Sequence, residues 1–228
     1  MITGFPDCRS VLVLAPHPDD EALGCAGTLA LLNRKGVSST VVFLTDGERL
    51  NGPPSPEMAA QRRAEGVAAS AMLGCGEPNF LGLPDGGIGG RMDEACTRLS
   101  EIIAIEKPDF IFAPSPVDHH EDHLATAGIA LRLMEDMKSF RLAFCEIYST
   151  VRFTHLVDIS ELVGIKEETI MKYRVSLYGR PELYVHATLG LNAHRSLFTQ
   201  TKGYYEAFWI IEKPLKNEEI AAWVGYRA

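Results

Sequence analysis

Two short clusters of histidines and carboxylates carry the residue types that bind metal ions. The first follows an apolar run at residues 11–15 and reads Pro-His-Pro-Asp-Asp-Glu over residues 16–21. The second follows another apolar run at residues 110–114 and reads Asp-His-His-Glu-Asp-His over residues 118–123. A catalytic zinc ion takes three protein ligands from His, Asp or Glu and leaves one position for water. Two such clusters meeting in space would therefore indicate a metal-dependent hydrolase.

The spacing within each cluster suits a shared ion. His17 and Asp20 are three residues apart in the turn that leaves a strand, so both can point to one side of it. His120 and His123 are three residues apart at the start of a predicted helix, where positions i and i+3 share a face. Each cluster can thus present two ligands to the same point.

Each cluster also has an interpretation without a metal. The aspartates after His17 could cap the next helix, because Asp is a preferred N-cap residue. The second cluster could be a solvated loop, and the spacing of Asp118 and Glu121 predicts a capping box at the helix that follows. Both clusters end strands of one predicted sheet, where open α/β folds place ligand sites, so we favour the metal site.

The elements that must position these clusters alternate between strand and helix. Apolar runs bounded by turn residues predict strands, and amphipathic runs predict helices. Strands are predicted at residues 11–15, 40–45, 79–83 and 109–113, with helices at residues 21–35, 57–73, 92–106 and 124–137. This order predicts an α/β, Rossmann-like three-layer fold, with a mostly parallel sheet and helices on both faces.

The last third of the sequence is less regular. Strands are predicted at residues 142–148, 157–159 and 206–212, a helix at residues 161–178, and helix or loop at residues 183–198. No linker, repeat or low-complexity segment divides the chain. One domain over residues 1–228 is therefore the simplest expectation.

Composition argues against several classes of protein. The chain has 22 Lys and Arg against 30 Asp and Glu, a net charge of −8, which disfavours a nucleic-acid partner. No apolar stretch approaches the 18 residues of a membrane span, and the first ten residues lack a signal-peptide layout. The five cysteines are odd in number and widely spaced, which argues against a secreted disulfide framework. We expect a cytoplasmic protein, whose irregular last third could form a homo-oligomer interface.

The two clusters, together with smaller matches in register, resemble the LmbE-like or PIG-L family. The matching segments lie at residues 16–21, 23–27, 45–48, 62–65, 81–86, 116–123 and 206–208. The resemblance covers roughly residues 8–212. It implies a zinc-dependent hydrolase that removes the N-acetyl group from an N-acetylglucosamine conjugate, releasing acetate and a free amine.

The resemblance also implies residue roles. His17, Asp20 and His123 would be the zinc ligands, although such a ligand set could also hold Fe²⁺ or another divalent ion. Asp19 would be the general base that takes a proton from the attacking water. His120 would stabilise the negative charge that develops on the amide oxygen.

Four further residues have expected roles. Arg62 matches the family's sugar-contacting arginine, and Asp85 is expected to reach a sugar hydroxyl. Glu21 is expected in the first turn of a helix, where a negative charge suits the dipole, with an outer contact to a metal ligand as the alternative. Asp122 is expected to orient a ligand histidine or a neighbouring cation. The expected partner is a small-molecule amino-sugar conjugate.

The resemblance weakens toward the C-terminal end. The family's Lys-x-x-Ala segment, which ends in Ser-Gln, is matched only in part between Lys166 and Ser176. That region commonly shapes the aglycone side of the pocket, so the aglycone is left open. Two other functions also fit: a metal-dependent amidase acting on a non-sugar N-acyl group, and a catalytically idle sugar-binding member. The retention of Asp19 and His120 argues against the idle member.

Overall fold

The computed structural model describes residues 2–50, 52–216 and 218–220. Its eight strands form one sheet in the order β1-β7-β8-β6-β5-β2-β3-β4. Neighbouring strands pair in parallel except at β8, which is antiparallel to both β6 and β7. The strands are β1 (Ile2–Thr3), β2 (Ser10–Ala15), β3 (Ser38–Thr45), β4 (Asn79–Leu83), β5 (Phe110–Pro114), β6 (Arg141–Cys145), β7 (His155–Asp158) and β8 (Tyr205–Ile211).

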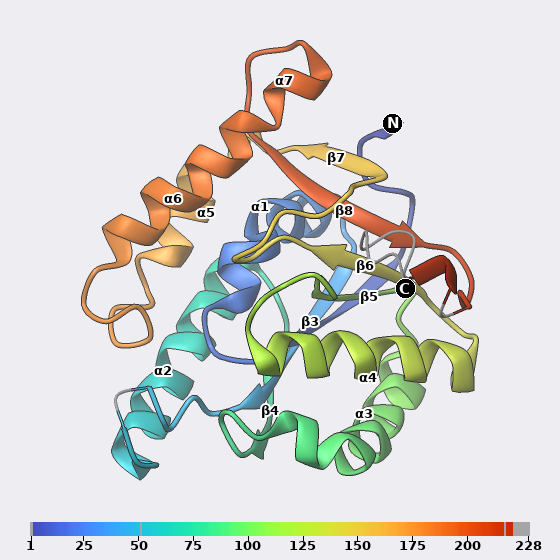
Figure 1. Ribbon diagram of the computed structural model, residues 1–228. Helices are drawn as coiled ribbons and strands as arrows, with labels where there is room; N and C mark the ends of the chain where they lie inside the picture. Colours follow the sequence, from blue (N-terminus) through green and yellow to red (C-terminus); the bar gives the residue numbers. More distant parts are fainter. Residues whose placement is uncertain (1, 51, 217, 221–228) are drawn as a thin grey trace.

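Helices cover both faces of this sheet (Figure 1). One face carries α3 (Met92–Glu106) and α4 (Glu121–Met137), and the other carries α1 (Asp20–Arg34), α2 (Pro56–Leu73) and α5 (Val163–Ile170). Farther out on the second side lie α6 (Pro181–His194) and the short α7 (Ser196–Thr199). Two 3₁₀ turns lie at Ile88–Arg91 and Ser160–Leu162. The predicted three-layer α/β fold is confirmed.

Alternation along the central strands builds a core on each side of the sheet. In β2, Leu12 and Leu14 pack into the cluster that includes α3 and α4, whereas Val11 and Val13 pack into the cluster that includes α1. Successive strand residues point to opposite faces, so a strand covered on both sides reads as one continuous apolar run. For that reason β2 and β5 were recognisable from sequence.

Two predicted elements in the last third are wrong in extent. The helix predicted at residues 161–178 ends at Ile170, and the chain continues in turns. Long-range hydrogen bonds hold those turns. The Tyr173 hydroxyl donates to the Glu21 carboxylate, and the backbone N–H and the hydroxyl of Ser176 donate to the Glu65 carboxylate. The strand predicted at residues 142–148 ends at Cys145.

The other predicted boundaries agree with the structure more closely. The strand at residues 79–83 and the helix at residues 92–106 lie where they were predicted. The segment predicted as helix or loop at residues 183–198 forms α6 and α7, which meet at Arg195. The strand predicted at residues 157–159 begins earlier, as β7, because it pairs with β8 from His155 onward.

A fully buried ion pair ties three elements together. Lys166 on α5 lies 2.6 Å from Glu206 on β8, and neither side chain is exposed to solvent. Glu206 also accepts hydrogen bonds from the backbone N–H groups of Gly27 and Thr28 in α1. Lys166 in turn donates to the carbonyl oxygen of Leu23. The pair therefore fixes the helix that begins in the first histidine cluster.

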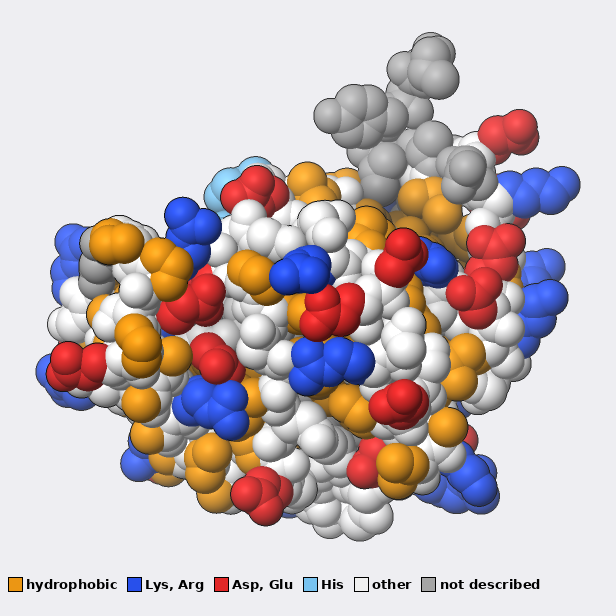
Figure 2. All heavy atoms as spheres, turned by 90° about the horizontal axis from the view of Figure 1, so that it is seen from below, with side chains coloured by type: hydrophobic (Ala, Val, Ile, Leu, Met, Phe, Trp, Pro, Cys, Tyr) orange, Lys and Arg blue, Asp and Glu red, His pale blue; other side chains and the backbone are white. Residues whose placement is uncertain are grey.

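The face of the molecule shown in Figure 2 carries both acidic and basic side chains. On the face viewed from below, acidic and basic side chains are interspersed, with apolar side chains scattered among them (Figure 2). Among the described residues, no helix combines the length and the apolar character needed to cross a membrane.

Replacing one partner of the buried pair should destabilise the fold strongly. We expect Lys166→Met to lower the free energy of unfolding by about 3–5 kcal/mol, because it leaves the Glu206 carboxylate buried without its counter-charge. The measurement is urea unfolding followed by circular dichroism. Lys172→Met is the matched control, because Lys172 is exposed nearby, and it should change stability by less than about 0.5 kcal/mol. Equal losses in the two variants would contradict this view of the pair.

Candidate metal centre

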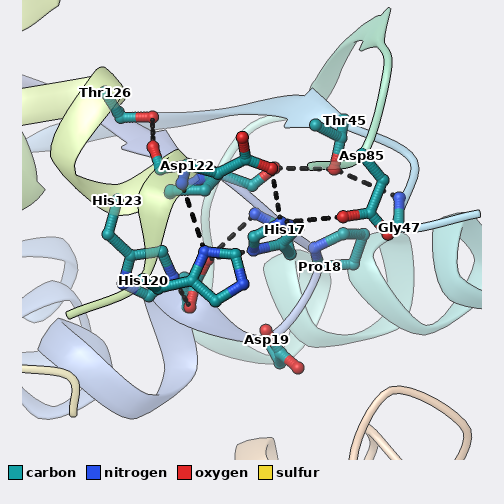
Figure 3. A network of polar contacts seen from close by, with 12 residues as sticks. His17, Pro18, Asp19, Thr45, Gly47, Asp85, His120, Asp122, His123 and Thr126 are labelled. Atoms are coloured by element: carbon teal, nitrogen blue, oxygen red, sulfur yellow. Dashed lines mark hydrogen bonds and ion pairs between the residues drawn. The ribbon is translucent and has the colours of Figure 1, made fainter. Parts of the chain in front are cut away.

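Sheet topology brings the two clusters together. β2 and β5 are parallel neighbours, with Val11 opposite Phe110, so their carboxyl ends lie at the same edge. His17 and Asp20 follow β2, whereas His120 and His123 lie at the start of α4, after β5. Figure 3 shows the three histidine rings grouped together, although the two clusters are about a hundred residues apart in sequence.

Asp20 lies between two of the histidines. Its Oδ2 is 3.2 Å from Nδ1 of His17, and its Oδ1 is 3.2 Å from Nε2 of His123. Ligand atoms around a tetrahedral zinc ion, with bonds of about 2.0–2.1 Å, lie about 3.3 Å from one another. Each of these two distances is that of two ligands on one ion, and the Asp20 carboxylate joins His17 to His123.

Unpaired buried atoms support the same fit. Oδ1 of Asp20 and both ring nitrogens of His123 are buried and have no hydrogen-bond partner within the described part of the chain, and Oδ1 of Asp20 faces Nε2 of His123. Buried polar atoms are nearly always paired, and an unpaired one needs an explanation. Two such atoms facing each other without forming a hydrogen bond are what a common cation would require.

The outward nitrogen of each ligand histidine meets carboxylates. Nε2 of His17 lies 3.2 Å from Oδ2 of Asp122 and 3.2 Å from Oδ1 of Asp85, and Nδ1 of His123 lies 3.4 Å from Oδ2 of Asp118. A ring N–H that faces a carboxylate leaves the other ring nitrogen unprotonated and able to bind metal. This arrangement is typical of metal-binding histidines.

Backbone N–H groups fix these outer carboxylates. Asp122 accepts from the N–H groups of Gly86 and Ile88, at 2.7 and 3.1 Å. Asp118 accepts from those of His120 and Tyr148, each at 3.1 Å. Because these hydrogen bonds hold both carboxylates in place, Asp122 can orient the ring of His17 and Asp118 the ring of His123.

Other groupings of side chains are geometrically close. Ligand atoms of His17, His120 and His123 lie within 4.8 Å of one another, as do those of His17, Asp85 and Asp122. Neither set contains Asp20. We favour the set with Asp20, because its Oδ1 is buried and unpaired within the described residues, although its Oδ2 accepts the His17 N–H. Both oxygens of Asp122 accept backbone N–H groups, and Nδ1 of His120 is occupied.

Charges around the centre shift the pKa values of the ligands. Burial raises the pKa of Asp20, but the adjacent His123 and His17 outweigh burial and leave that pKa well below its usual range. Burial lowers the pKa of His123, whereas Asp20 and Asp118 raise it to about 10 overall. In the absence of a bound cation, the carboxylates therefore attract protons to the rings. The same negative potential would favour a divalent cation.

Asp19 occupies an unusual backbone conformation beside the ligands. Its φ of 140° lies in a region that non-glycine residues rarely adopt, and such strain concentrates at functional sites. It precedes α1, but its side chain makes no capping hydrogen bond, contrary to the capping interpretation. Burial raises the pKa of Asp19 to about 7, although Arg62 acts in the opposite direction. Its carboxylate lines a cavity of about 320 Å³ and is drawn apart from the ligand network in Figure 3.

Arg62, predicted to contact a sugar, is almost fully engaged within the protein. Its guanidinium lies 3.3 Å from Oδ2 of Asp19 and donates to Ser176 Oγ and to the carbonyl oxygens of Gly47 and Pro18. Gly47 is required here, because its φ is 65° and a Cβ would lie 2.1 Å from the guanidinium. Arg62 also lines the cavity, where a sugar could reach it, and its contact with a sugar stays a prediction. Within the structure its charged partner is Asp19.

His120 caps its own helix. Its Nδ1 accepts the backbone N–H of Asp122 at 3.2 Å, so the neutral ring carries its proton on Nε2. Burial, His17 and His123 lower the pKa of His120, which favours this neutral form. His120 also lines the cavity.

The predicted capping box between Asp118 and Glu121 is wrong. His120 is the N-cap residue of α4, and Asp118 instead receives the His120 N–H and faces His123. A carboxylate at this position can either cap the helix or orient a histidine ring. In the structure Asp118 contacts the ring of His123 rather than capping α4. Asp118 is thus a site residue that sequence reasoning assigned to a different task.

Contacts with neighbouring residues hold the carboxylates of Glu21 and Asp85 in place. Glu21 is buried in the first turn of α1, as predicted, and accepts a hydrogen bond from the Tyr173 hydroxyl. Burial raises the pKa of Glu21 to about 8, although that hydrogen bond acts in the opposite direction. Asp85 lines the cavity and contacts His17, and its other oxygen accepts the N–H of Arg49.

Sequence reasoning missed several aromatic and polar side chains of the cavity wall. Tyr148 stacks on His123, with ring centroids 5.5 Å apart and planes inclined by 15°. No spacing in the sequence marks it, because it comes from the loop after β6. The other lining residues without a sequence signal are Arg49, Leu50, Tyr178 and Tyr184, whereas Ser176 ends the segment that matches the family in part.

The comparisons with known proteins agree with this geometry. The profile of PIG-L, described as GlcNAc-PI de-N-acetylase, matches residues 12–134, which contain both histidine clusters. The chain belongs to the PIG-L family. The resemblance noted in the sequence is therefore confirmed, and so is the expectation of an N-deacetylase.

Relatives extend the similarity beyond the profile. A probable N-acetyl-alpha-D-glucosaminyl L-malate deacetylase 2 of Bacillus subtilis is 30% identical over 93% of this chain and 92% of its own length. The diacetylchitobiose deacetylase of Thermococcus kodakarensis is 26% identical over 71% of this chain and 68% of its own. The crystal structure of a conserved protein from Thermus thermophilus superposes with a TM-score of 0.74 and 30% identity, covering 90% of this chain and 96% of that one.

The ligand assignment predicts a selective loss of metal. His123→Ala should bind zinc at least about a hundredfold more weakly than the wild type, because it removes a buried nitrogen that faces Asp20. The measurement is metal content by mass spectrometry, followed by zinc titration of the stripped protein. His119→Ala is the matched control, because the adjacent His119 side chain is 73% exposed and should not affect binding. Full zinc occupancy in His123→Ala would remove that residue from the ligand set.

Proposed function

We propose that the protein is a zinc-dependent hydrolase that removes the acetyl group from an N-acetylglucosamine-type conjugate. The observation that carries this proposal is the placement of Asp19. Its carboxylate lies in the cavity beside the grouped His17, Asp20 and His123, with a pKa raised to about 7. Family membership and the deacetylase activities for which the relatives are named support the N-acetyl amino-sugar class.

Two nitrogens and a carboxylate suit zinc, and the same ligand set could hold Fe²⁺. When bound, such an ion lowers the pKa of water toward about 7 and polarises the amide carbonyl. His17, Asp20 and His123 would hold it, with Asp118 and Asp122 orienting the two rings.

Asp19 would move the proton. A carboxylate with a pKa near the working pH can take a proton from the attacking water and later deliver it to the leaving amine. Arg62 contacts Asp19 at 3.3 Å and so fixes the direction of that carboxylate. Base and acid are thus the same residue at successive steps.

His120 would stabilise the charge that develops on the amide oxygen. Its cap contact leaves the proton of the neutral ring on Nε2, and His120 lines the cavity. Removing one donor of this kind typically lowers the rate about a hundredfold to a thousandfold. The donor is neutral, so it stabilises the transition state without attracting an anion to the resting site.

The sugar would occupy the polar part of the cavity. Arg49, Asp85 and Ser176 line it, and they offer both donors and acceptors for hydroxyl groups. Contacts of Arg62 and Asp85 with the sugar remain predictions, because both side chains also serve internal contacts.

We also propose one domain over residues 1–228 and a cytoplasmic location. All five cysteines are unpaired, which fits a reducing compartment. A homo-oligomer stays a prediction.

Acetate release separates the proposal from its alternatives. The purified protein is incubated with N-acetylglucosamine conjugates and with non-sugar N-acetyl amines, with and without a chelator. We expect acetate from the sugar conjugates only, lost with the chelator and restored by added zinc. Release from the non-sugar amines alone would support the amidase alternative. Sugar binding without any release would support an idle sugar-binding protein.

Asp19→Asn should separate metal binding from turnover. Since Asn keeps the shape but cannot accept a proton, we expect full zinc content with kcat lowered by about 10²- to 10⁴-fold. Both quantities are measured on one preparation. Asp46→Asn is the control, because Asp46 pairs with Arg63 outside the cavity. Normal turnover in Asp19→Asn would remove this residue from the reaction.

Arg62→Met should move the acid limb of the pH profile. Arg62 lowers the pKa of Asp19, so removing its positive charge raises that pKa. Since the base acts when deprotonated, kcat/KM should begin to fall at a higher pH than in the wild type. Profiles from about pH 5 to 9 test this. Arg62→Lys and Arg63→Met should keep the wild-type limb, and an unshifted limb in Arg62→Met would disprove the coupling.

A further inference from the structure

A second cavity lies beside the catalytic one. Its volume is about 480 Å³, and Tyr148 and Tyr184 line both cavities, so the two cavities adjoin at these residues. α6, which forms one wall, lies on the outer side of the molecule next to α5 (Figure 1). The lining residues are Leu23, Ile147, Tyr148, Leu183, Tyr184, Ala187, Thr188 and Leu191.

This apolar groove, as we call these eight residues, differs in character from the catalytic cavity. None of the eight side chains carries a charge, and only three hydroxyl groups are polar. The catalytic cavity, in contrast, is lined by charged or titratable side chains that include Asp19, Arg49 and Asp85. A molecule that spans both cavities must therefore be polar at one end and apolar at the other.

The sequence of α6 makes this groove. Leu183, Ala187 and Leu191 follow one another at intervals of four residues and so share one face of the helix. Val185 and Asn192 are buried elsewhere on the helix. Leu183 is 55% exposed and lines the groove, so this large apolar side chain is accessible to a ligand.

The opposite wall of the groove is well fixed. Leu23 is only 4% exposed and belongs to a buried cluster with Tyr173 and Val185. Ile147 packs against that cluster, and so does Tyr184 from the α6 side. Because its walls rest on a packed core, the groove is preformed, as ligand pockets of about 300–1,000 Å³ usually are.

We propose that the apolar groove binds an apolar substituent carried by the amino-sugar substrate. This inference rests on the proposed function, since it places the acetamido group at Asp19 and the sugar in the polar cavity. The substituent would then pass between Tyr148 and Tyr184 into the groove. The substrate class is thus an N-acetyl amino sugar with an alkyl or aryl aglycone.

Transfer energetics set the size of the effect. Each methylene moved from water into an apolar site strengthens binding by up to about fourfold. A carboxylate placed there without a partner is strongly disfavoured. No cationic side chain is among the eight lining residues.

The test compares glycosides that differ only in the aglycone. Acetate release is measured for methyl, butyl and hexyl 2-acetamido-2-deoxyglucosides and for a carboxyalkyl glycoside as long as the hexyl compound. We expect kcat/KM to rise by up to about fourfold per methylene, mainly through KM, and the carboxyalkyl compound to gain nothing. Leu183→Ser should lower the ratio of kcat/KM for the hexyl glycoside to kcat/KM for the methyl glycoside, even if it also changes both absolute values.

Leu197→Ser is the matched control. Leu197 is 70% exposed on α7 and does not line the groove, so this variant should keep the wild-type ratio. Turnover of the methyl glycoside with no gain for hexyl, or a preference for the carboxyalkyl compound, would overturn the groove assignment and leave the proposed function intact.

Binding distinguishes failure of the groove from failure of the proposed function. If no glycoside releases acetate, the proposed function is wrong, and calorimetric titration of the methyl and hexyl glycosides decides the groove alone. Tighter binding of hexyl, reduced in Leu183→Ser, supports an apolar subsite. Equal affinity for the two glycosides overturns it.

Discussion

The carboxylate of Asp20 is the constraint on which the site depends. Its two oxygens face Nδ1 of His17 and Nε2 of His123, each at 3.2 Å, so it joins residues from both clusters. This is feasible only because β2 and β5 are adjacent parallel strands whose ends share one edge of the sheet. Any slip of that pairing would separate the histidines, whatever the local sequence of either cluster.

Burying so many ionisable groups is costly unless each has a partner, and the structure supplies partners from far along the chain. Arg62 reaches Asp19, Lys166 reaches Glu206, and Arg195 reaches Glu146. Each of these pairs joins separate elements. The Arg62–Asp19 pair also lines the catalytic cavity, so this one contact serves both stability and catalytic geometry.

Sequence sufficed where a local pattern determines the structure. The alternating core of β2 and the spacing of His17, Asp20, His120 and His123 could be interpreted without coordinates. It failed where a distant contact decides, as at residues 171–178, which Glu21 and Glu65 hold in turns rather than a helix. Asp118 shows the same limit, because its spacing suits a cap while its actual neighbour is His123.

The proposed catalytic groups and the walls of the apolar groove come from different parts of the chain. The family profile ends at residue 134, and the groups proposed to hold the metal and move the proton all lie before that point. The walls that a substituent would meet lie after it, from Ile147 to Leu191, except for Leu23. Chemistry needs side chains fixed to within fractions of an ångström, which strand ends and helix starts provide. Selectivity needs only the shape and polarity of a surface, and a peripheral helix such as α6 can change both without disturbing Asp20.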